Sequence, residues 1–220
     1  MPTILITGAS SGIGLELTRL YQQQGDDVIA VCRNLSTDLA ATKARVIDEI
    51  DFLDNASYAV LQEKLDGVSI DILINNAGIF LNETIAEMPF DQISTQFEVN
   101  ALAPMKVTMA LLKNLRHGSK ILMTTSRMGS IGDNTGGAYY GYRASKAALN
   151  ALAVSLSVDL KEQGISVGLV HPGFVKTKMT GFRGDITPLE SAKGYLEVVD
   201  KLNINNSGGF WHVNGEVLPW

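Results

Sequence analysis

The sequence is poor in cysteine: Cys32 is the single one among 220 residues. One cysteine excludes an intramolecular disulfide framework. The chain also lacks an uninterrupted apolar run of roughly eighteen residues, the length that a membrane-spanning helix requires. Near its first residue it lacks a basic segment followed by a long apolar one. These absences predict a cytoplasmic protein without a membrane span.

A concentration of positive charge is absent as well. Lysine and arginine number 18 against 23 aspartates and glutamates, the formal net charge is -5, and no run of basic residues occurs. Nucleic acid is therefore not an expected partner, and any anion has to be bound at a local site. His117, His171 and His212 are scattered along the chain, so no metal site is predicted.

The sequence does contain enough apolar residues for a full core, because 45% of its residues are hydrophobic. It shows no internal repeat, no low-complexity tract and no linker. The simplest organisation is one domain that spans residues 1–220.

The stretch from Thr3 to Leu20 combines a short apolar strand, a glycine turn and an amphipathic helix. Gly8, Gly12 and Gly14 let the backbone turn sharply and approach a ligand, while the amide groups at the start of the helix face an anion such as a pyrophosphate. The spacing is Gly-x-x-x-Gly-x-Gly rather than the commoner Gly-x-Gly-x-x-Gly. A strand-to-helix turn that binds no ligand is the alternative interpretation.

Residues after the next two expected strands bear on the choice of cofactor. Arg33 follows the strand Asp27–Cys32, where dinucleotide-binding folds place an acidic residue for the ribose hydroxyls or an arginine for a 2′-phosphate. Arg33 and the cysteine before it are not acidic, which favours a phosphorylated cofactor; a solvated surface arginine is the alternative. After the strand Arg45–Ile50, Asp51 and Phe52 either border the adenine or act as ordinary caps.

Strands and helices alternate along the rest of the chain. We expect strands at residues 70–74, 120–125, 165–170 and 209–213, and helices at 55–65, 90–115, 142–163 and 188–202. This alternation predicts an α/β, doubly wound Rossmann-type fold: a parallel seven-stranded sheet with helices on both faces and ligands at the carboxyl ends of the strands. Polar or turn-forming residues follow six of these strands, namely Thr7 and Gly8, Arg33, Asp51, Asn76, Ser126 and Pro172.

Tyr142 and Lys146 are four residues apart at the start of an expected helix, so both side chains lie on one face within reach of a shared ligand. A free phenol has a pKa of about 10, and proton transfer near neutrality requires a shift of roughly three units toward the phenolate. Lys146 and the amino-terminal end of the helix both favour the phenolate. Such a pair is a weak signal by itself and gains weight from its context.

That context is a set of motifs in a fixed order: the glycine loop, Asn75-Asn76-Ala77-Gly78, Asn100, Ser126, Tyr-x-x-x-Lys and Pro172-Gly173. Together they resemble the classical short-chain dehydrogenase/reductase family over essentially the whole chain. The run from Ser126 to Gly137 and the short carboxyl end are most similar to the C-factor and Sniffer carbonyl-reductase-like group.

By this resemblance Tyr142 is the general acid in carbonyl reduction, Ser126 hydrogen-bonds the substrate oxygen, and Lys146 holds the nicotinamide ribose and lowers the tyrosine pKa. Asn100 would position a water molecule that relays protons to Lys146. The implied cofactor contacts are Gly8, Ser10, Ser11, Gly12, Ile13, Gly14, Arg33, Asp51, Phe52, Asn76, Ala77, Gly78, Tyr142, Lys146, Pro172, Gly173, Val175 and Thr177.

Two features depart from the family pattern. Many members that prefer the phosphorylated cofactor have a basic residue where this chain has Ser11. A preference for NADP(H) over NAD(H) would therefore depend largely on Arg33. The segment between Thr177 and Pro188 is short for a substrate lid, which indicates an open and permissive pocket.

The serine that holds the substrate oxygen is ambiguous by spacing, because the family places it roughly thirteen residues before the tyrosine. Ser126 is sixteen residues before Tyr142 and Ser130 is twelve. We favour Ser126, since it follows the apolar strand directly and the glycine-rich stretch after it can absorb extra residues. Ser130 is expected to bond to backbone.

The leading hypothesis is an oxidoreductase that transfers a hydride between NADP(H) and a small carbonyl or alcohol substrate. The alternative is a catalytically silent, cofactor-binding signalling or regulatory protein. The family resemblance also implies a homodimer formed through the helices at 90–115 and 142–163, although the same apolar faces could simply cover the sheet.

Overall fold

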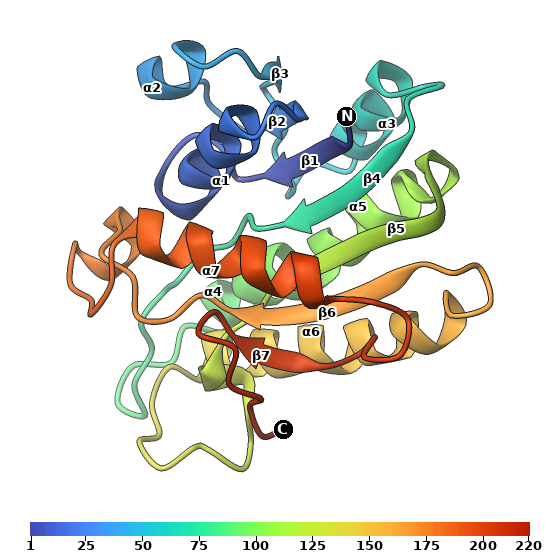
Figure 1. The fold of residues 1–220 in the computed structure, drawn as a ribbon. Helices are drawn as coiled ribbons and strands as arrows, with labels where there is room; N and C mark the ends of the chain where they lie inside the picture. Colours follow the sequence, from blue (N-terminus) through green and yellow to red (C-terminus); the bar gives the residue numbers. More distant parts are fainter.

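The computed structural model describes residues 1–220 and contains all seven expected strands. They are β1 (Thr3–Thr7), β2 (Asp27–Val31), β3 (Arg45–Ile47), β4 (Ile70–Asn75), β5 (Leu115–Thr124), β6 (Ser166–His171) and β7 (Phe210–His212). They form one sheet in the order β3-β2-β1-β4-β5-β6-β7, and every neighbouring pair is parallel (Figure 1). The predicted doubly wound, parallel seven-stranded sheet is confirmed.

Helices cover both faces of this sheet. They are α1 (Gly12–Gln23), α2 (Thr37–Ala40), α3 (Ala56–Lys64), α4 (Phe90–Phe97), α5 (Ala103–Ala110), α6 (Tyr140–Asp159) and α7 (Pro188–Lys201). In Figure 1, α1 and α7 lie in front of the sheet, and α3, α5 and α6 lie behind it. None of the helices has the length and hydropathy needed to cross a bilayer.

The two faces have separate apolar cores because successive side chains of a strand point in opposite directions. Ile4 and Ile6 of β1 pack in the cluster that contains Leu17 of α1, whereas Leu5 packs in the cluster that contains Leu149 of α6. All five side chains are fully buried. Full burial of such a side chain stabilises the fold by about 1.5–3 kcal/mol, which fixes the register of β1 between the two layers.

The strand order reverses next to β1. β1 pairs with β2 on one side and with β4 on the other, so the loops that follow β1 and β4 leave the sheet toward opposite faces. A crevice opens at such a switch point, outside the carboxyl ends of the strands. Most of the predicted cofactor residues lie on loops at this edge, whereas Gly12, Ile13 and Gly14 begin α1, and Tyr142 and Lys146 lie near the start of α6.

The prediction of one continuous helix over residues 90–115 is wrong. A π-helical turn (Glu98–Leu102) separates α4 from α5, and a 3₁₀ turn (Leu112–Asn114) follows. The π turn contains Asn100, whose buried amide bonds to the main chain of Ile79 outside the helix. β5 then begins at Leu115, because Leu115 pairs with Ile70 before the register shifts.

Smaller differences occur at other element ends. β3 stops at Ile47 rather than residue 50, and Glu49 adopts a left-handed φ of 60° that ends the extended pairing. The short helix α2 was not expected; the hydroxyl of Ser36 caps it by accepting from the amide of Leu39. α6 begins at Tyr140, two residues early, because Tyr139 supplies a left-handed amino-terminal cap.

Candidate active site

The turn between β1 and α1 is a backbone cradle that tolerates only glycine at two positions. Gly8 has a φ of +68°, and a Cβ there would lie 2.8 Å from the Cα of Ala77. A Cβ on Gly14 would overlap the carbonyl oxygen of Gly8 and lie 2.7 Å from Nδ2 of Asn76. The missing side chains therefore let the loops after β1 and β4 approach each other closely.

The amino-terminal end of α1 is free to bind an anion. Ser11 is the cap residue, it is exposed, and its side chain accepts no hydrogen bond from the first turn of the helix, which has no acidic residue. The first amide groups of a helix have no partner within the helix, and its dipole favours negative charge there. These features fit a pyrophosphate, so the residues present match the dinucleotide cofactor that the sequence predicts.

Asn76 supports the cradle from the loop after β4. Its amide and that of Ala77 donate to Oγ1 of Thr7 at 3.0 and 3.1 Å, and its Nδ2 donates to the carbonyl of Thr7 at 3.0 Å. Across the loop, a Cβ on Gly12 would lie 3.3 Å from Cγ2 of Thr177. The structure thus brings together the predicted cofactor residues of the loops after β1, β4 and β6.

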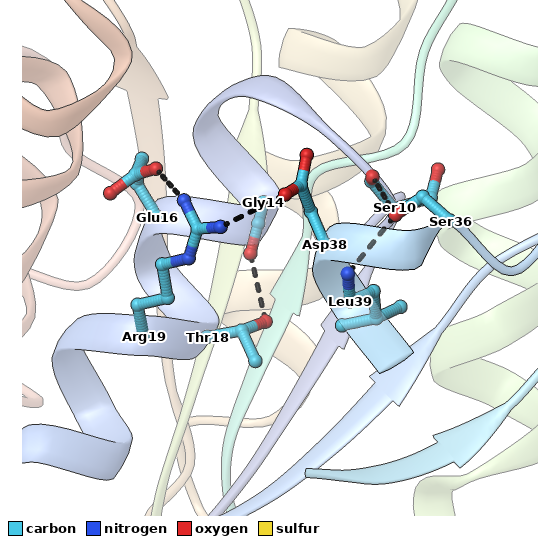
Figure 2. A network of polar contacts seen from close by, with 8 residues as sticks. All are labelled: Ser10, Gly14, Glu16, Thr18, Arg19, Ser36, Asp38 and Leu39. Carbon is cyan, nitrogen blue, oxygen red and sulfur yellow. Dashed lines mark hydrogen bonds and ion pairs between the residues drawn. The ribbon is translucent and has the colours of Figure 1, made fainter. Parts of the chain in front are cut away.

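A second tether, which sequence reasoning missed, joins the glycine loop to α2. Oγ of Ser36 donates to the carbonyl of Ser10 at 2.6 Å, and Figure 2 shows this bond beside the cap of α2. Arg19 of α1 forms ion pairs with Glu16 at 2.6 Å and with Asp38 of α2 at 3.6 Å. Ile13, another predicted cofactor contact, is half-buried and packs against the apolar cluster that contains Leu17.

Arg33 lies beside Asp51, beyond the carboxyl ends of β2 and β3. Nη1 of Arg33 is 3.9 Å from Oδ2 of Asp51, and the two side chains are 65% and 43% exposed. Asp51 also accepts from the amide of Leu53 at 3.0 Å, as a turn-capping residue does. The Phe52 ring stacks on Tyr58 with centroids 6.0 Å apart. The structure gathers these predicted adenosine-side residues, but it leaves them at the surface.

Tyr142, which is half-buried, and Lys146, which is buried, lie on the same face of α6. Nζ of Lys146 lies 5.8 Å from the centroid of the Tyr142 ring and donates to the carbonyl of Thr124, the last residue of β5, at 2.8 Å. The lysine is only 3% exposed. Its amino group is therefore fixed between α6 and the end of β5, two residues before Ser126.

The protonation of Tyr142 and Lys146 differs from the expectation that the tyrosine pKa is lowered toward neutrality. Burial raises the pKa of Tyr142 to about 12, and a hydrogen bond with Ser126 offsets only part of that rise. Burial likewise lowers the pKa of Lys146 to about 7. The loss of hydration thus outweighs the attraction between phenolate and ammonium, and the phenol is protonated near neutrality. A protonated phenol is the form that donates a proton to a carbonyl oxygen.

The two candidate serines have different surroundings. Ser126 caps the 3₁₀ turn Arg127–Gly129 by accepting from the amide of Met128 at 3.1 Å, and its hydroxyl is close enough to Tyr142 to lower the pKa of the phenol. Ser130 accepts from the amide of Asp133 at 3.1 Å. Only Ser126 is brought to the phenol; Ser130 lies further along the loop.

Asn100 is fully buried and holds the loop after β4. Its Oδ1 accepts from the amide of Ile79 at 2.8 Å, and its Nδ2 donates to the Ile79 carbonyl at 2.9 Å and to Oγ of Ser145 at 3.1 Å. A Cβ on Gly78 would lie 3.1 Å from Oδ1 of Asn100 and 3.8 Å from Nζ of Lys146. Gly78 therefore separates Asn100 from Lys146 without filling the space between them.

The segment after β6 forms the opposite wall of the crevice. Pro172 accepts from Oγ of Ser191 at 2.8 Å, and Gly173 has a φ of +82° with Ile186 packed where a Cβ would be. Val175 is 4% exposed and pairs with Ile186 in an isolated bridge. The lid beyond it contains only a 3₁₀ turn, Lys178–Thr180, before α7.

The histidines form no cluster that could hold a metal ion. The rings of His171 and His212 meet edge to face with centroids 5.0 Å apart. Burial, with smaller contributions from His212 and Arg127, lowers the pKa of His171 to about 3, so its ring is neutral. The pair packs beside Gly173: a Cβ on this glycine would lie 3.5 Å from Nε2 of His212.

Three further residues beside Tyr142 were missed from the sequence. The centroid of the Phe80 ring lies 4.9 Å from that of Tyr142, and the two rings meet edge to face. The Tyr139 ring is tilted against Phe80, with centroids 5.3 Å apart. Glu83 is fully buried and accepts from the amide of Gly141. These residues lie in loops, where hydrophobic periodicity carries no signal, so no pattern in the sequence could have identified them.

The sequence profile of the short chain dehydrogenase family matches residues 2–185. The chain belongs to this family. Its short-chain dehydrogenase fold accounts for the order in which the glycine loop, Asn76, Asn100, Ser126 and Tyr142 meet at one edge of the sheet, and the family resemblance seen in the sequence is confirmed.

Two relatives of this short-chain dehydrogenase are similar over most of its length. It is 38% identical to the 1-hydroxy-2-glutathionyl-2-methyl-3-butene dehydrogenase of Rhodococcus sp. strain AD45, with 100% of both chains covered. It is 42% identical to the C-signal protein of Myxococcus xanthus over 69% of this chain and 93% of that protein.

Two solved structures share the fold over the full chain. The carbonyl reductase Sniffer of D. melanogaster superposes with a TM-score of 0.92 at 31% identity and 100% coverage of both chains. An NADPH-bound carbonyl reductase from chicken fatty liver superposes with a TM-score of 0.88 at 31% identity, covering 100% of this chain and 99% of that one. The predicted similarity to the C-factor and Sniffer group is confirmed.

Proposed function

We propose that this short-chain dehydrogenase reduces a small carbonyl substrate with NADPH, or oxidises the corresponding alcohol with NADP, and that Tyr142 is its general acid and base. The observation that carries the proposal is that half-buried Tyr142 meets the buried side chains of Lys146 and Ser126 at the carboxyl end of β5. They lie at the same edge of the sheet as the glycine cradle. The unit that performs the reaction is residues 1–220.

The division of labour follows from the protonation of the site. A bound reduced nicotinamide supplies the hydride. Ser126 donates a hydrogen bond to the carbonyl oxygen and orients it, and Tyr142, which is protonated near neutrality, donates its proton to that oxygen. Lys146 then stabilises the phenolate and holds the nicotinamide ribose in place of its present contact with Thr124.

A water molecule held by the π turn (Glu98–Leu102) is proposed to relay the proton that returns to Lys146. The side chain of Asn100 already bonds to Ile79 and Ser145. A water molecule for the relay would therefore bond to main-chain atoms of the turn, which Asn100 holds in shape. This assignment keeps the predicted role of Asn100 but makes its side chain a support.

The preference for NADP(H) rests on Arg33. A guanidinium can bind a phosphate through two parallel hydrogen bonds, and this one is exposed beside the expected adenosine site. The NADPH in the chicken carbonyl reductase supports the same cofactor class here. The ion pair with Asp51 competes with a phosphate for Arg33, so the preference is not absolute.

The substrate is a small, uncharged carbonyl compound or alcohol. The half-buried rings of Phe80 and Tyr139 line the approach to Tyr142, and the lid is short. The Rhodococcus relative is named for the dehydrogenation of a hydroxy compound that has a glutathionyl group, which supports alcohol–carbonyl chemistry in this part of the family.

The test is a screen of the purified protein with NADPH and NADH against aldehydes, ketones and quinones, followed by nicotinamide absorbance. We expect turnover of at least one compound class, faster with NADPH. Cofactor binding, measured by nicotinamide fluorescence, without turnover of any compound would favour the cofactor-binding regulator instead. Lack of cofactor binding would contradict both functions.

We also propose a homodimer that pairs α4 and α6 of one copy with those of another. Phe90 of α4 is 73% exposed and Val158 of α6 is 67% exposed, while Phe97 and Met109 are also exposed. Light scattering at micromolar concentration should give twice the 23.7 kDa chain mass. A species of 23.7 kDa alone would contradict this proposal.

A further inference from the structure

The connection after β4 contains a buried carboxyl group that the proposed reaction does not use. Glu83 is fully buried, and none of the ion pairs in the structure involves it. Burial of a carboxylate without a cation is costly unless hydrogen bonds satisfy its oxygens. The hydrogen bonds that satisfy this one come from Gln96 of α4 and from the start of α6, next to Tyr142.

Both the main chain and the side chain of Glu83 hold that helix start. Its carbonyl accepts from the amide of Tyr139 at 3.1 Å, and Oε2 accepts from the amide of Gly141 at 3.3 Å. α6 has no acidic residue in its first turn and no side-chain cap of its own. Glu83 therefore supplies, from another loop, the acceptor that a helix amino terminus normally takes from its own cap.

Gln96 of α4 fixes the carboxylate from the other side. Its Nε2 donates to Oε1 of Glu83, and its Oε1 accepts from the amide of Leu81 at 2.8 Å. Gln96 is also fully buried. The chain Leu81–Gln96–Glu83–Gly141 thus links the loop after β4, α4 and α6 through hydrogen bonds in which each group has a partner.

Gly141 is required for this approach. A Cβ on it would lie 2.6 Å from Nε2 of Gln96, 2.7 Å from Oε1 of Glu83 and 3.0 Å from the Cα of Ile93. Ala138 and Tyr139, three and two residues before it, have φ values of 52° and 54°. A left-handed conformation costs such residues about 1 kcal/mol or more each, so neighbouring contacts have to maintain the turn.

We infer that Glu83 and Gln96 form a clamp that positions Tyr142 for proton transfer. The inference rests on the proposed function, because it assigns the clamp to the same tyrosine. Glu83 touches neither the expected cofactor nor the reacting atoms, and it acts through Gly141. Phe80 of the same loop packs against the Tyr142 ring itself, so the loop contacts the tyrosine directly as well as through Gly141.

The test exchanges the partners of the clamp. In Glu83→Gln, the new amide nitrogen faces either Nε2 of Gln96 or the amide of Gly141, and two donors oppose each other in both orientations. In the double variant Glu83→Gln/Gln96→Glu, the side-chain carboxylate at position 96 accepts from the main-chain amide of Leu81 and from the side-chain amide nitrogen at position 83. The side-chain oxygen at position 83 accepts from the main-chain amide of Gly141. We expect Glu83→Gln to lower kcat at least tenfold at unchanged NADPH affinity, and the double variant to recover it to within threefold.

A cycle with Tyr142→Phe separates positioning from general destabilisation. If Glu83 acts through Tyr142, Glu83→Gln has less than a twofold effect in single-turnover measurements on the Tyr142→Phe background. A loss of equal size in both backgrounds, wild-type kcat in Glu83→Gln, or no recovery in the double variant would overturn the inference. Glu87→Gln, at an exposed glutamate of the same loop, is the matched control and should keep wild-type kcat.

A readout without turnover distinguishes this inference from the proposed function. Hydrogen exchange of the Gly141 amide, followed by nuclear magnetic resonance, should accelerate in Glu83→Gln and slow again in the double variant. Unchanged exchange would overturn the clamp even in an active enzyme. If exchange changes as expected but the wild type reduces no carbonyl compound, the clamp stands and the proposed reaction fails.

Discussion

The two ends of the proposed cofactor site are built in opposite ways. At the end that we propose to be catalytic, Asn100, Ser126 and Lys146 are buried, and each makes a hydrogen bond of 2.8–3.1 Å to a main-chain group. At the adenosine end, Arg33 is 65% exposed and its one ion partner lies 3.9 Å away. The position of the catalytic groups is thus fixed by packing, whereas an exposed pair of this kind contributes only about 0–1 kcal/mol.

This difference indicates which property of the protein tolerates change. A buried polar group that loses its partner cannot recover the hydrogen bond from water, so changes at the catalytic end should be severe. An exposed arginine that loses its partner is solvated at once. We therefore expect cofactor preference to be adjustable without loss of the fold or of the chemistry.

The largest effect is expected at the phenol. Tyr142→Phe should fold and bind cofactor as the wild type does, but it should lose reduction by about three orders of magnitude, since only the transferable proton is removed. Steady-state turnover and cofactor fluorescence measure the two properties. Substantial residual turnover would show that another group protonates the substrate.

The next effect is a pH dependence of stability caused by Lys146. Its pKa is about 7 in the folded protein and about 10.4 when unfolded, so between these values the unfolded chain binds more protons and stability rises with pH. From pH 7 to pH 9 this single group should add about 2 kcal/mol to the free energy of unfolding. Urea unfolding at both pH values measures the gain.

The matched variant for that experiment is Lys146→Met, which keeps the length of the side chain and removes the charge. It should lack the gain between pH 7 and pH 9. An equal gain in the variant would assign the pH dependence to other groups and place the lysine pKa near its ordinary value.

The serines provide a comparison within one loop. Ser126→Ala should lower turnover at least tenfold, because it removes a hydrogen bond that strengthens in the transition state. Ser130→Ala should change turnover little, since Ser130 bonds to the backbone of its own loop. The reverse ranking in kcat would show that the spacing from the tyrosine, not the strand end, identifies the substrate serine.

The smallest effect is expected at the adenosine end. Arg33→Ala should raise the KM for NADPH roughly five- to tenfold and leave that for NADH nearly unchanged. Asp51→Asn should act in the opposite direction, because it frees Arg33 from its ion pair. Equal effects of Arg33→Ala on both cofactors would remove the argument for NADP(H) preference.

Much of the molecule could be predicted from local pattern. The alternation of apolar strands and helices gives a parallel sheet, and the glycine spacing and Tyr-x-x-x-Lys mark its ligand edge. The π turn at Asn100 could not be predicted, because its cause is a pair of hydrogen bonds to Ile79, twenty-one residues away in the sequence. The direction of the Tyr142 pKa shift was predicted wrongly for a related reason. The sequence shows the neighbouring lysine, which favours the phenolate, but it does not show the burial of the phenol, which opposes ionisation.

The sequence by itself determined the fold, the family and the edge of the sheet at which we propose that the chemistry occurs, because these follow from periodicity and from residues close together in the chain. Only the tertiary structure decided the protonation of Tyr142 and Lys146, the contact of Ser126 with the phenol, and the burial of Glu83 against Gly141. These depend on desolvation and on hydrogen bonds between loops that are distant in sequence. Such interactions exist only when the strands of the sheet have brought those loops together.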